Sequence, residues 1–117
     1  MKALLIVNDP PYGTEKLYNA LRLGHALQKR DDVTAVTVFL VADSVSGARR
    51  GQKTPEGFYN IERMLKRLTI GKGHVLLCGT CMDARGMTDA DIVEGAVRST
   101  MDELAEATAM ADKVMVF

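Results

Sequence analysis

Short apolar runs alternating with helix-type stretches are the feature that most constrains the fold of this chain. The run Ala3–Val7 contains no polar residue, as expected of a strand buried on both faces of a sheet. A valine-rich run follows at Val33–Ala42, another apolar run at His74–Cys78, and the chain ends in Val114–Phe117. A weaker run at Glu94–Arg98 completes a set of five expected strands.

Between these runs, apolar residues recur at the spacing of an amphipathic helix. A further helix is predicted after Thr100, whose spacing to Glu103 fits a capping box. Strands alternating with helices predict an α/β fold, a three-layer α/β/α sandwich with a mainly parallel five-stranded sheet, in a single domain of residues 1–117. Two such helices are predicted before the third apolar run. The apolar stripe of the first is Leu17, Ala20, Leu21, Gly24 and Leu27, and that of the second is Ile61, Met64, Leu65 and Leu68.

The loops that leave the carboxyl ends of the strands are where we expect the site. Right-handed crossovers place every strand-to-helix loop at one edge of a parallel sheet, and ligands bind outside that edge. The loops gathered there would be Asn8–Gly13, Asp43–Gly57 and Cys78–Gly86.

Charge and length restrict the classes of function. Fifteen basic residues balance fifteen acidic ones, so no basic excess suggests a nucleic-acid partner. No apolar run approaches the roughly 20 residues that span a bilayer, and the first run is too short for a signal peptide. We therefore expect a cytoplasmic protein, where thiols stay reduced and two cysteines suggest catalytic or redox chemistry before a structural disulfide. Zero net charge also does little to oppose self-association.

Cys78 and Cys81 are the only cysteines, and they stand three apart where the third strand ends. A thiolate is the nucleophile, and nearby positive charge lowers its pKa. Arg85, which follows in the same loop, and the Arg49–Arg50 pair could supply that charge to Cys78, while Cys81 would resolve a disulfide or persulfide. The alternative is an inert cysteine buried at a strand end.

Other candidate sites are weaker. Tyr12 and Gly13 lie in a strand-to-helix loop that would either bind an anion or form only a rigid turn. Arg49 and Arg50 fit the same anion site or a solvated face. The first loop lacks the glycine pattern of a dinucleotide or P-loop site, so we expect no cofactor. A zinc site needs four ligands, and the two histidines fall on separate elements, so we expect no metal.

Several motifs together resemble the DsrE/DsrF-like family of small sulfur-handling proteins, and within it the YchN-type branch. The resemblance runs along the whole chain. It is carried by Pro11-Tyr12-Gly13-Thr14, Arg50-Gly51-Gln52-Lys53, Gly57-Phe58-Tyr59-Asn60-Ile61, the segment Cys78–Gly86 and the closing segment Ala111–Phe117.

The resemblance implies a role for one cysteine. In sulfur-relay members, a cysteine at the end of the third strand carries a persulfide, eight residues before the glycine of an Arg-Gly pair. Cys78 and Gly86 keep that spacing, so the carrier role falls on Cys78. The resemblance also implies a homohexamer and partner proteins that donate and accept sulfur. Cys81 is typical of the YchN-type branch and not of the relay carriers.

Three functions therefore remain open from the sequence. The first is a sulfur-carrier or sulfurtransferase-like protein in which Cys78 holds the sulfur, Arg85 stabilises its thiolate and Cys81 resolves it. The second is a CxxC thiol–disulfide protein, which would form a Cys78–Cys81 disulfide readily. The third is a non-enzymatic oligomeric module that binds a small anion at the same edge of the sheet.

Overall fold

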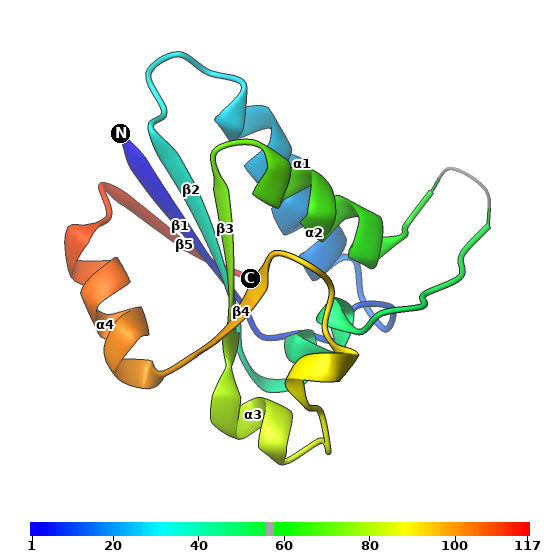
Figure 1. The fold of residues 1–117 in the computed structure, drawn as a ribbon. Helices are drawn as coiled ribbons and strands as arrows, with labels where there is room; N and C mark the ends of the chain where they lie inside the picture. The colour runs from blue at the N-terminus through cyan, green and yellow to red at the C-terminus, as the bar shows by residue number, and fades with distance from the viewer. Residues whose placement is uncertain (56–57) are drawn as a thin grey trace.

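The computed structural model describes residues 1–55 and 58–117, so the first residue of the Gly57–Ile61 motif lies outside the described part. Strands and helices alternate along the chain, as the sequence predicts (Figure 1). They are β1 (Lys2–Val7), α1 (Lys16–Gln28), β2 (Ala35–Leu40), the 3₁₀ helix η1 (Ala42–Ala48), α2 (Ile61–Ile70), β3 (Gly73–Cys78), α3 (Gly79–Asp83), the 3₁₀ helix η2 (Asp89–Asp91), β4 (Ala96–Ser99), α4 (Met101–Met110) and β5 (Lys113–Val116).

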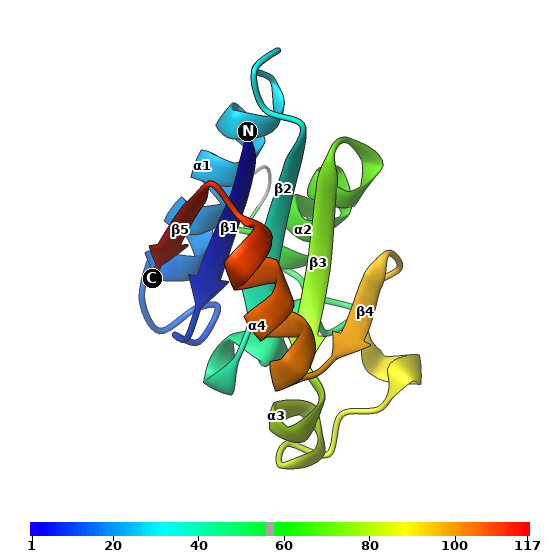
Figure 2. The same cartoon turned by 90° about the vertical axis from the view of Figure 1, so that its left-hand side faces the viewer.

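The five strands form one sheet in the order β4-β3-β2-β1-β5, and every pairing is parallel. Helices α1 and α2 lie on one face of this sheet, and α4 lies on the other (Figures 1 and 2). The predicted α/β sandwich with a parallel five-stranded sheet is thus confirmed. None of the helices in the described part of the chain is long and apolar enough to cross a membrane.

Helices α2 and α4 each begin at a residue whose side chain caps the helix. The Asn60 side chain accepts a hydrogen bond from the Arg63 N–H at 3.0 Å, and Thr100 caps α4 in the same way from Glu103 at 3.1 Å. The apolar stripe of α1 packs on the sheet, with Leu17 and Leu21 fully buried. Burial of these stripes between helix and sheet contributes most of the stability of such a domain.

The α4 face of the sheet is only partly covered. One row of apolar side chains crosses all five strands on this face, because paired residues of parallel strands point to the same side. Phe39 at its centre is fully buried, whereas the ends of the row at both sheet edges are exposed. In sheet order the row is Val97, Leu76, Phe39, Ile6 and Val116. Cys78 lies two residues beyond Leu76 on β3 and thus on the same side of the sheet.

Two segments differ from the sequence-based expectation. The fourth strand runs over Ala96–Ser99 rather than Glu94–Arg98, because it pairs with β3 in a register that begins at Val75 and ends at Cys78. The segment after Cys78, interpreted as loop from Asp83 onward, begins with the short helix α3. The two cysteines therefore open a helical turn directly after a strand.

Candidate functional site

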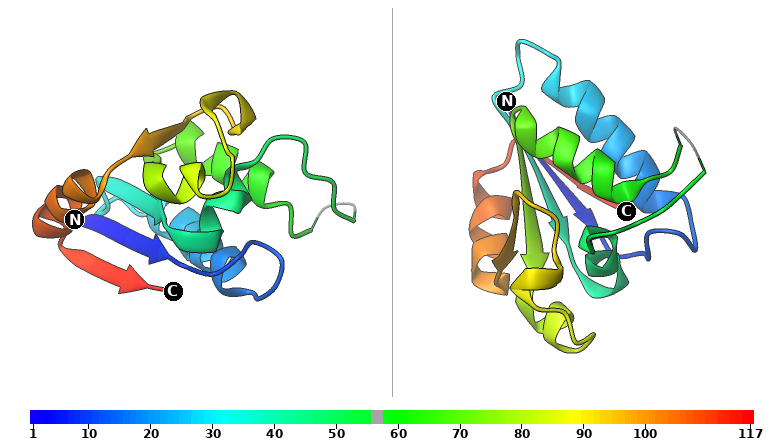
Figure 3. Two further views of the ribbon diagram at one scale, coloured as in Figure 1. Left: turned by 90° about the horizontal axis from the view of Figure 1, so that it is seen from below. Right: turned by 45° about the vertical axis from the view of Figure 1, so that its right-hand side comes forward.

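Cys78 ends β3 and caps α3, and this position determines what surrounds its sulfur. The Cys78 Sγ accepts a hydrogen bond from the Cys81 N–H at 3.3 Å and lies 3.2 Å from the Thr80 hydroxyl. The residue is only 6% exposed. The sulfur therefore occupies a small polar cradle, made by the first turn of α3, at the carboxyl edge of the sheet. Figure 3 (right) shows α3 directly after β3 at this edge.

This cradle favours the Cys78 thiolate. Burial alone raises the pKa of the Cys78 thiol, because a charge loses its hydration there. Hydrogen bonds from the Cys81 thiol, from Thr80 and from the backbone act in the opposite direction and outweigh burial. The pKa of Cys78 is consequently lowered, so that Cys78 is the more acidic of the two thiols.

Cys81 has a different environment. Burial and the neighbouring Cys78 raise its pKa, while the Ala42 N–H and the charge of Arg85 oppose that rise. The Ala42 N–H donates to the Cys81 Sγ at 3.2 Å. Ala42 has a φ of 56°, a left-handed conformation that alanine adopts at a cost of about 1–2 kcal/mol. The turn that joins β2 to η1 is thus strained at the amide that contacts Cys81.

Arg85 contacts the Cys81 side of the site and has no hydrogen bond to Cys78. Its Nη1 donates to the Cys81 carbonyl oxygen at 3.0 Å, and its Nε donates to Asp43 at 3.0 Å. Asp43 follows Ala42 in η1. Arg85 therefore connects α3 to the turn whose amide bonds the Cys81 sulfur.

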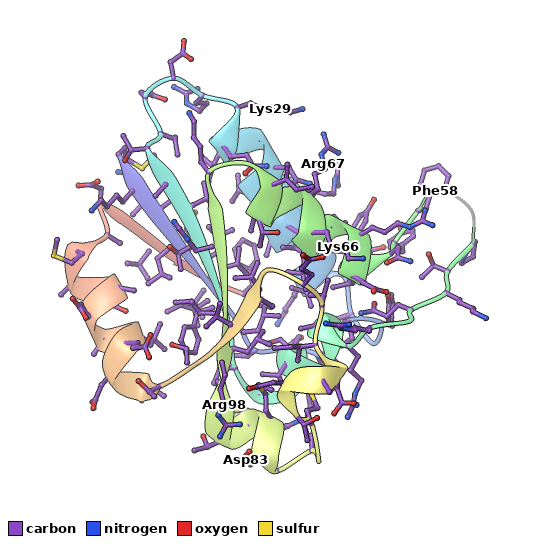
Figure 4. All side chains as sticks on the ribbon, viewed as in Figure 1. Lys29, Phe58, Lys66, Arg67, Asp83 and Arg98 are labelled. Atoms are coloured by element: carbon purple, nitrogen blue, oxygen red, sulfur yellow. The ribbon has the colours of Figure 1, made fainter. Side chains whose placement is uncertain are left out.

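Arg98 is the cation that the sequence did not reveal. Its guanidinium group forms two parallel hydrogen bonds with Asp83, at 2.9 and 2.7 Å (Figure 4). The pKa of Arg98 is raised, first by its hydrogen bond to Asp83 and to a smaller extent by the negative charge of Cys78. The Arg98 guanidinium group also packs against Gly79, the residue that follows Cys78.

The predicted basic pair does not contact the cysteines. The Arg49 Nη2 donates to the Arg85 carbonyl oxygen at 3.1 Å, and the Arg50 Nε donates to the Ile92 carbonyl oxygen. These two side chains thus hold the segment between α3 and β4 against η1.

Tyr12 and Gly13 lie in the loop after β1, as expected, but Tyr12 makes its contacts away from the cysteines. The Tyr12 hydroxyl donates to the Gln52 side chain and accepts the Ile61 N–H at 3.2 Å. Gly13 is exposed in the turn beside it. The loops after β1, β2 and β3 share one edge of the sheet, yet no hydrogen bond in the described part joins Tyr12 to Cys78.

Both cysteines are free thiols. Within residues 1–55 and 58–117, no group of three or more His, Cys, Asp or Glu side chains is placed to hold a metal ion. The contacts of the two sulfur atoms support the chemistry of a lowered-pKa thiol with a second thiol beside it.

Known proteins place the chain in a family. The model of the DsrE/DsrF-like family matches residues 1–117. Protein YchN of Escherichia coli is 42% identical over 116 residues, which cover 99% of this chain and 98% of YchN. The crystal structure of Escherichia coli YchN superimposes on this chain with a TM-score of 0.92. The match covers 100% of this chain and 99% of the YchN chain. Sulfurtransferase TusD of Salmonella typhi is 27% identical, and the match spans both chains in full. The chain is therefore a member of the DsrE/DsrF-like family.

Proposed function

We propose that this protein is a sulfur carrier in which Cys78 accepts a sulfane sulfur as a persulfide and passes it on. The observation that carries the proposal is the cradle around the Cys78 Sγ. There, hydrogen bonds from the Cys81 thiol, the Thr80 hydroxyl and the Cys81 N–H outweigh burial and lower the pKa of Cys78. Membership of the DsrE/DsrF-like family and the relationship to sulfurtransferase TusD support a role in sulfur transfer. We place this chemistry in the cytosol, where thiols stay reduced.

The transfer needs only thiol exchange. The Cys78 thiolate attacks the outer sulfur of a donor persulfide, so that a new S–S bond forms at Cys78. The S–S bond of the donor breaks, and the donor leaves as a thiolate. The reverse reaction on an acceptor thiolate returns Cys78 to its starting state. Arg98 and the donors of the cradle stabilise the negative charge of Cys78 before and after each transfer.

A thiol–disulfide function is the second candidate, and one observation favours it. Cys78 and Cys81 open a helical turn after a strand, and the Cys81 N–H bonds the Cys78 sulfur. In this reaction Cys78 would attack an external disulfide and release one partner thiolate. Cys81 would then attack the Cys78 sulfur of the mixed disulfide and release the second thiolate.

Intact-mass spectrometry separates these functions. The reduced protein is treated with a polysulfide donor, freed of excess reagent and weighed as wild type, Cys78→Ser and Cys81→Ser. The carrier function predicts the mass of one added sulfur atom on wild type and Cys81→Ser, but not on Cys78→Ser. A loss of two hydrogen atoms from wild type without added sulfur on any variant would favour the disulfide function. Sulfur that follows Cys81 would transfer the carrier role to Cys81.

We also propose that the protein assembles into a homo-oligomer, a hexamer, through its α4 face. The apolar row across the sheet has exposed ends at Val97 and Val116, and Met101 and Met110 of α4 are exposed as well. Net charge is zero, so long-range repulsion between copies is weak. A second copy would remove this apolar surface from water.

A further inference from the structure

A groove between α1 and α2 lies apart from the cysteines and is lined by different residues. It has a volume of about 690 Å³, and α1 contributes Tyr18, Arg22 and His25 to its wall. These positions repeat at helical spacing and form one face of α1. Arg63 and Arg67, one turn apart on α2, contribute the opposite wall, and residues 52–55 and 58–60 complete the lining. Figure 3 (right) shows the two helices side by side.

The described residues that line this groove carry charge of one sign. Arg22, Arg63, Arg67 and Lys53 line it, and no aspartate or glutamate among the described residues does. A groove that concentrates cations attracts small anions, because its walls exclude water and weaken screening.

The rest of the structure shows how unusual these arginines are. The chain has eight arginines. Arg30, Arg85 and Arg98 each pair with an aspartate, and Arg49 and Arg50 bond to carbonyl oxygens. Within residues 1–55 and 58–117, each arginine outside the groove thus has an acceptor in the fold.

The three remaining arginines all line the groove. Among the described residues, Arg22 hydrogen-bonds only to the side-chain oxygen of Asn19, at 3.2 Å. Its guanidinium carbon lies over the Tyr18 ring, 5.7 Å from the ring centroid. Arg63 and Arg67 form no ion pair with a described residue. The planar guanidinium group binds phosphate through two parallel hydrogen bonds, which matches an arginine that pairs with no carboxylate of residues 1–55 and 58–117.

Aromatic rings lie beside these cations. Tyr18 and Tyr59 stack with their ring centroids 4.3 Å apart, and Tyr59 has a φ of 57°. The Tyr59 hydroxyl bonds to Glu15 at 2.9 Å, which holds the ring against α1. One face of Tyr59 is covered by Tyr18, and the residue is still 44% exposed. An exposed ring face beside cations suits a planar aromatic group that carries phosphate.

We propose that this groove binds a free nucleoside phosphate, with the phosphates on Arg22, Arg63 and Arg67 and the base on Tyr59. The volume of the groove is in the range of small-molecule sites and fits one nucleotide rather than a strand. The zero net charge of the chain also argues against a nucleic-acid partner. This site is independent of the persulfide function.

Titration calorimetry on the full chain tests the proposal with ADP, inorganic pyrophosphate and adenosine as probes. We expect ADP to bind more tightly than pyrophosphate, and adenosine to bind least. The double variant Arg63→Gln/Arg67→Gln should bind both ADP and pyrophosphate about tenfold more weakly, which corresponds to about 1.4 kcal/mol of binding free energy. Tyr59→Leu should lower the affinity for ADP but leave the affinity for pyrophosphate unchanged, since only ADP carries a base.

The matched control is Lys66→Gln. Lys66 lies on α2 next to Arg67, outside the groove, and pairs with Glu62 at 3.9 Å (Figure 4). Its loss should leave ADP binding at the wild-type level, as should Cys78→Ser. Chemical-shift changes on adding ADP should map to Arg22, Tyr59 and Arg63.

Four outcomes would overturn the proposal. One is no binding of ADP or pyrophosphate to wild type at about millimolar concentration. The second is a loss of ADP affinity in Lys66→Gln equal to the loss in the double arginine variant, which would indicate nonspecific attraction of the anion by surface charge. The third is shift changes confined to Cys78–Asp83. The fourth is much tighter binding of a short RNA than of ADP through the same residues. The ligand of the groove would then be a nucleic-acid strand and not a free nucleotide.

Discussion

Arg98 packs against the backbone of Gly79, the residue that follows Cys78. A Cβ atom on Gly79 would lie 2.8 Å from the Arg98 Nε, closer than such atoms approach in proteins. Glycine at this position therefore lets an arginine from the edge strand β4 reach over the start of α3. Asp83, at the end of α3, then fixes the guanidinium group with two hydrogen bonds. The charge next to Cys78 thus depends on residues from two separate elements.

We predict that Arg98→Gln raises the pKa of Cys78 and slows its alkylation at neutral pH. The positive charge that stabilises the thiolate is lost, while the hydrogen bonds of the cradle remain. Arg98 is exposed to solvent, which screens its charge, so the rise in the pKa of Cys78 should be small. The measurement is the pH dependence of alkylation rate in a Cys81→Ser background, with Arg30→Gln as a distant control.

Gly79→Ala offers a second test of the same charge. The added methyl group should displace Arg98 and slow alkylation in the same direction as Arg98→Gln. Unchanged alkylation in both variants would show that the hydrogen bonds of the cradle alone determine the pKa of Cys78.

A second prediction concerns Ala42, whose N–H donates to the Cys81 sulfur from a left-handed conformation. Ala42→Gly should raise the free energy of unfolding by up to about 1 kcal/mol. Relief of about 1–2 kcal/mol of strain is offset by the greater freedom of glycine in the unfolded chain. Thermal unfolding measures the gain as a midpoint a few degrees higher. A lower midpoint would show that the methyl group of Ala42 contributes packing that outweighs the strain.

A third prediction links stability to pH through His25, which is 8% exposed. Burial lowers its pKa in the folded protein, the Met64 carbonyl opposes this, and Arg67 and Lys29 lower it further. Below about pH 6.5 the unfolded chain therefore binds a proton more readily than the folded one, and stability falls as pH falls. One proton allows a slope of at most about 1.4 kcal/mol per pH unit.

Chemical denaturation between about pH 5 and 7 measures this slope, above the range where carboxylates titrate. His25→Gln should flatten it. A slope that persists in His25→Gln would assign the effect to another group.

A fourth prediction addresses assembly. Light scattering at micromolar concentration should give a mass several times the 12.8 kDa of one chain, as a hexamer requires. Val116→Lys places a charge at the end of the apolar row and should reduce that mass. Ile70→Lys is the matched control, because Ile70 is 86% exposed but lies on α2, on the opposite side of the sheet. A wild-type monomer, or equal loss of mass in both variants, would contradict assembly through the α4 face.

The sequence predicted the backbone of the site better than its electrostatics. Apolar runs place Cys78 at the end of a strand, because hydrophobic pattern and strand length are local properties. Arg98 could not be found in this way. It reaches Gly79, the neighbour of Cys78, only because β4 pairs with β3 and brings Ser99 opposite Cys78. Strand order depends on tertiary packing that no local pattern contains.

The partners of Arg85 show the same limit. Its place in the loop was evident, and proximity to the cysteines was expected from the shared edge of the sheet. That it would bond to the carbonyl oxygen of Cys81 and to Asp43 depends on how η1 meets α3. The capping signal at Thr100 acts within one turn and is visible in sequence, whereas contacts between loops are not.

The small exposed fraction of Cys78 has a consequence for the lifetime of a sulfur atom held there. A persulfide at the surface is open to attack by any small thiol in solution, and its sulfur is soon lost as sulfide. At Cys78, where 6% of the residue is accessible, collisions from solvent rarely reach the sulfur. Release then requires a partner shaped to enter the cradle or a movement of α3. Such a carrier would exchange sulfur slowly with the bulk and selectively with its proper acceptor.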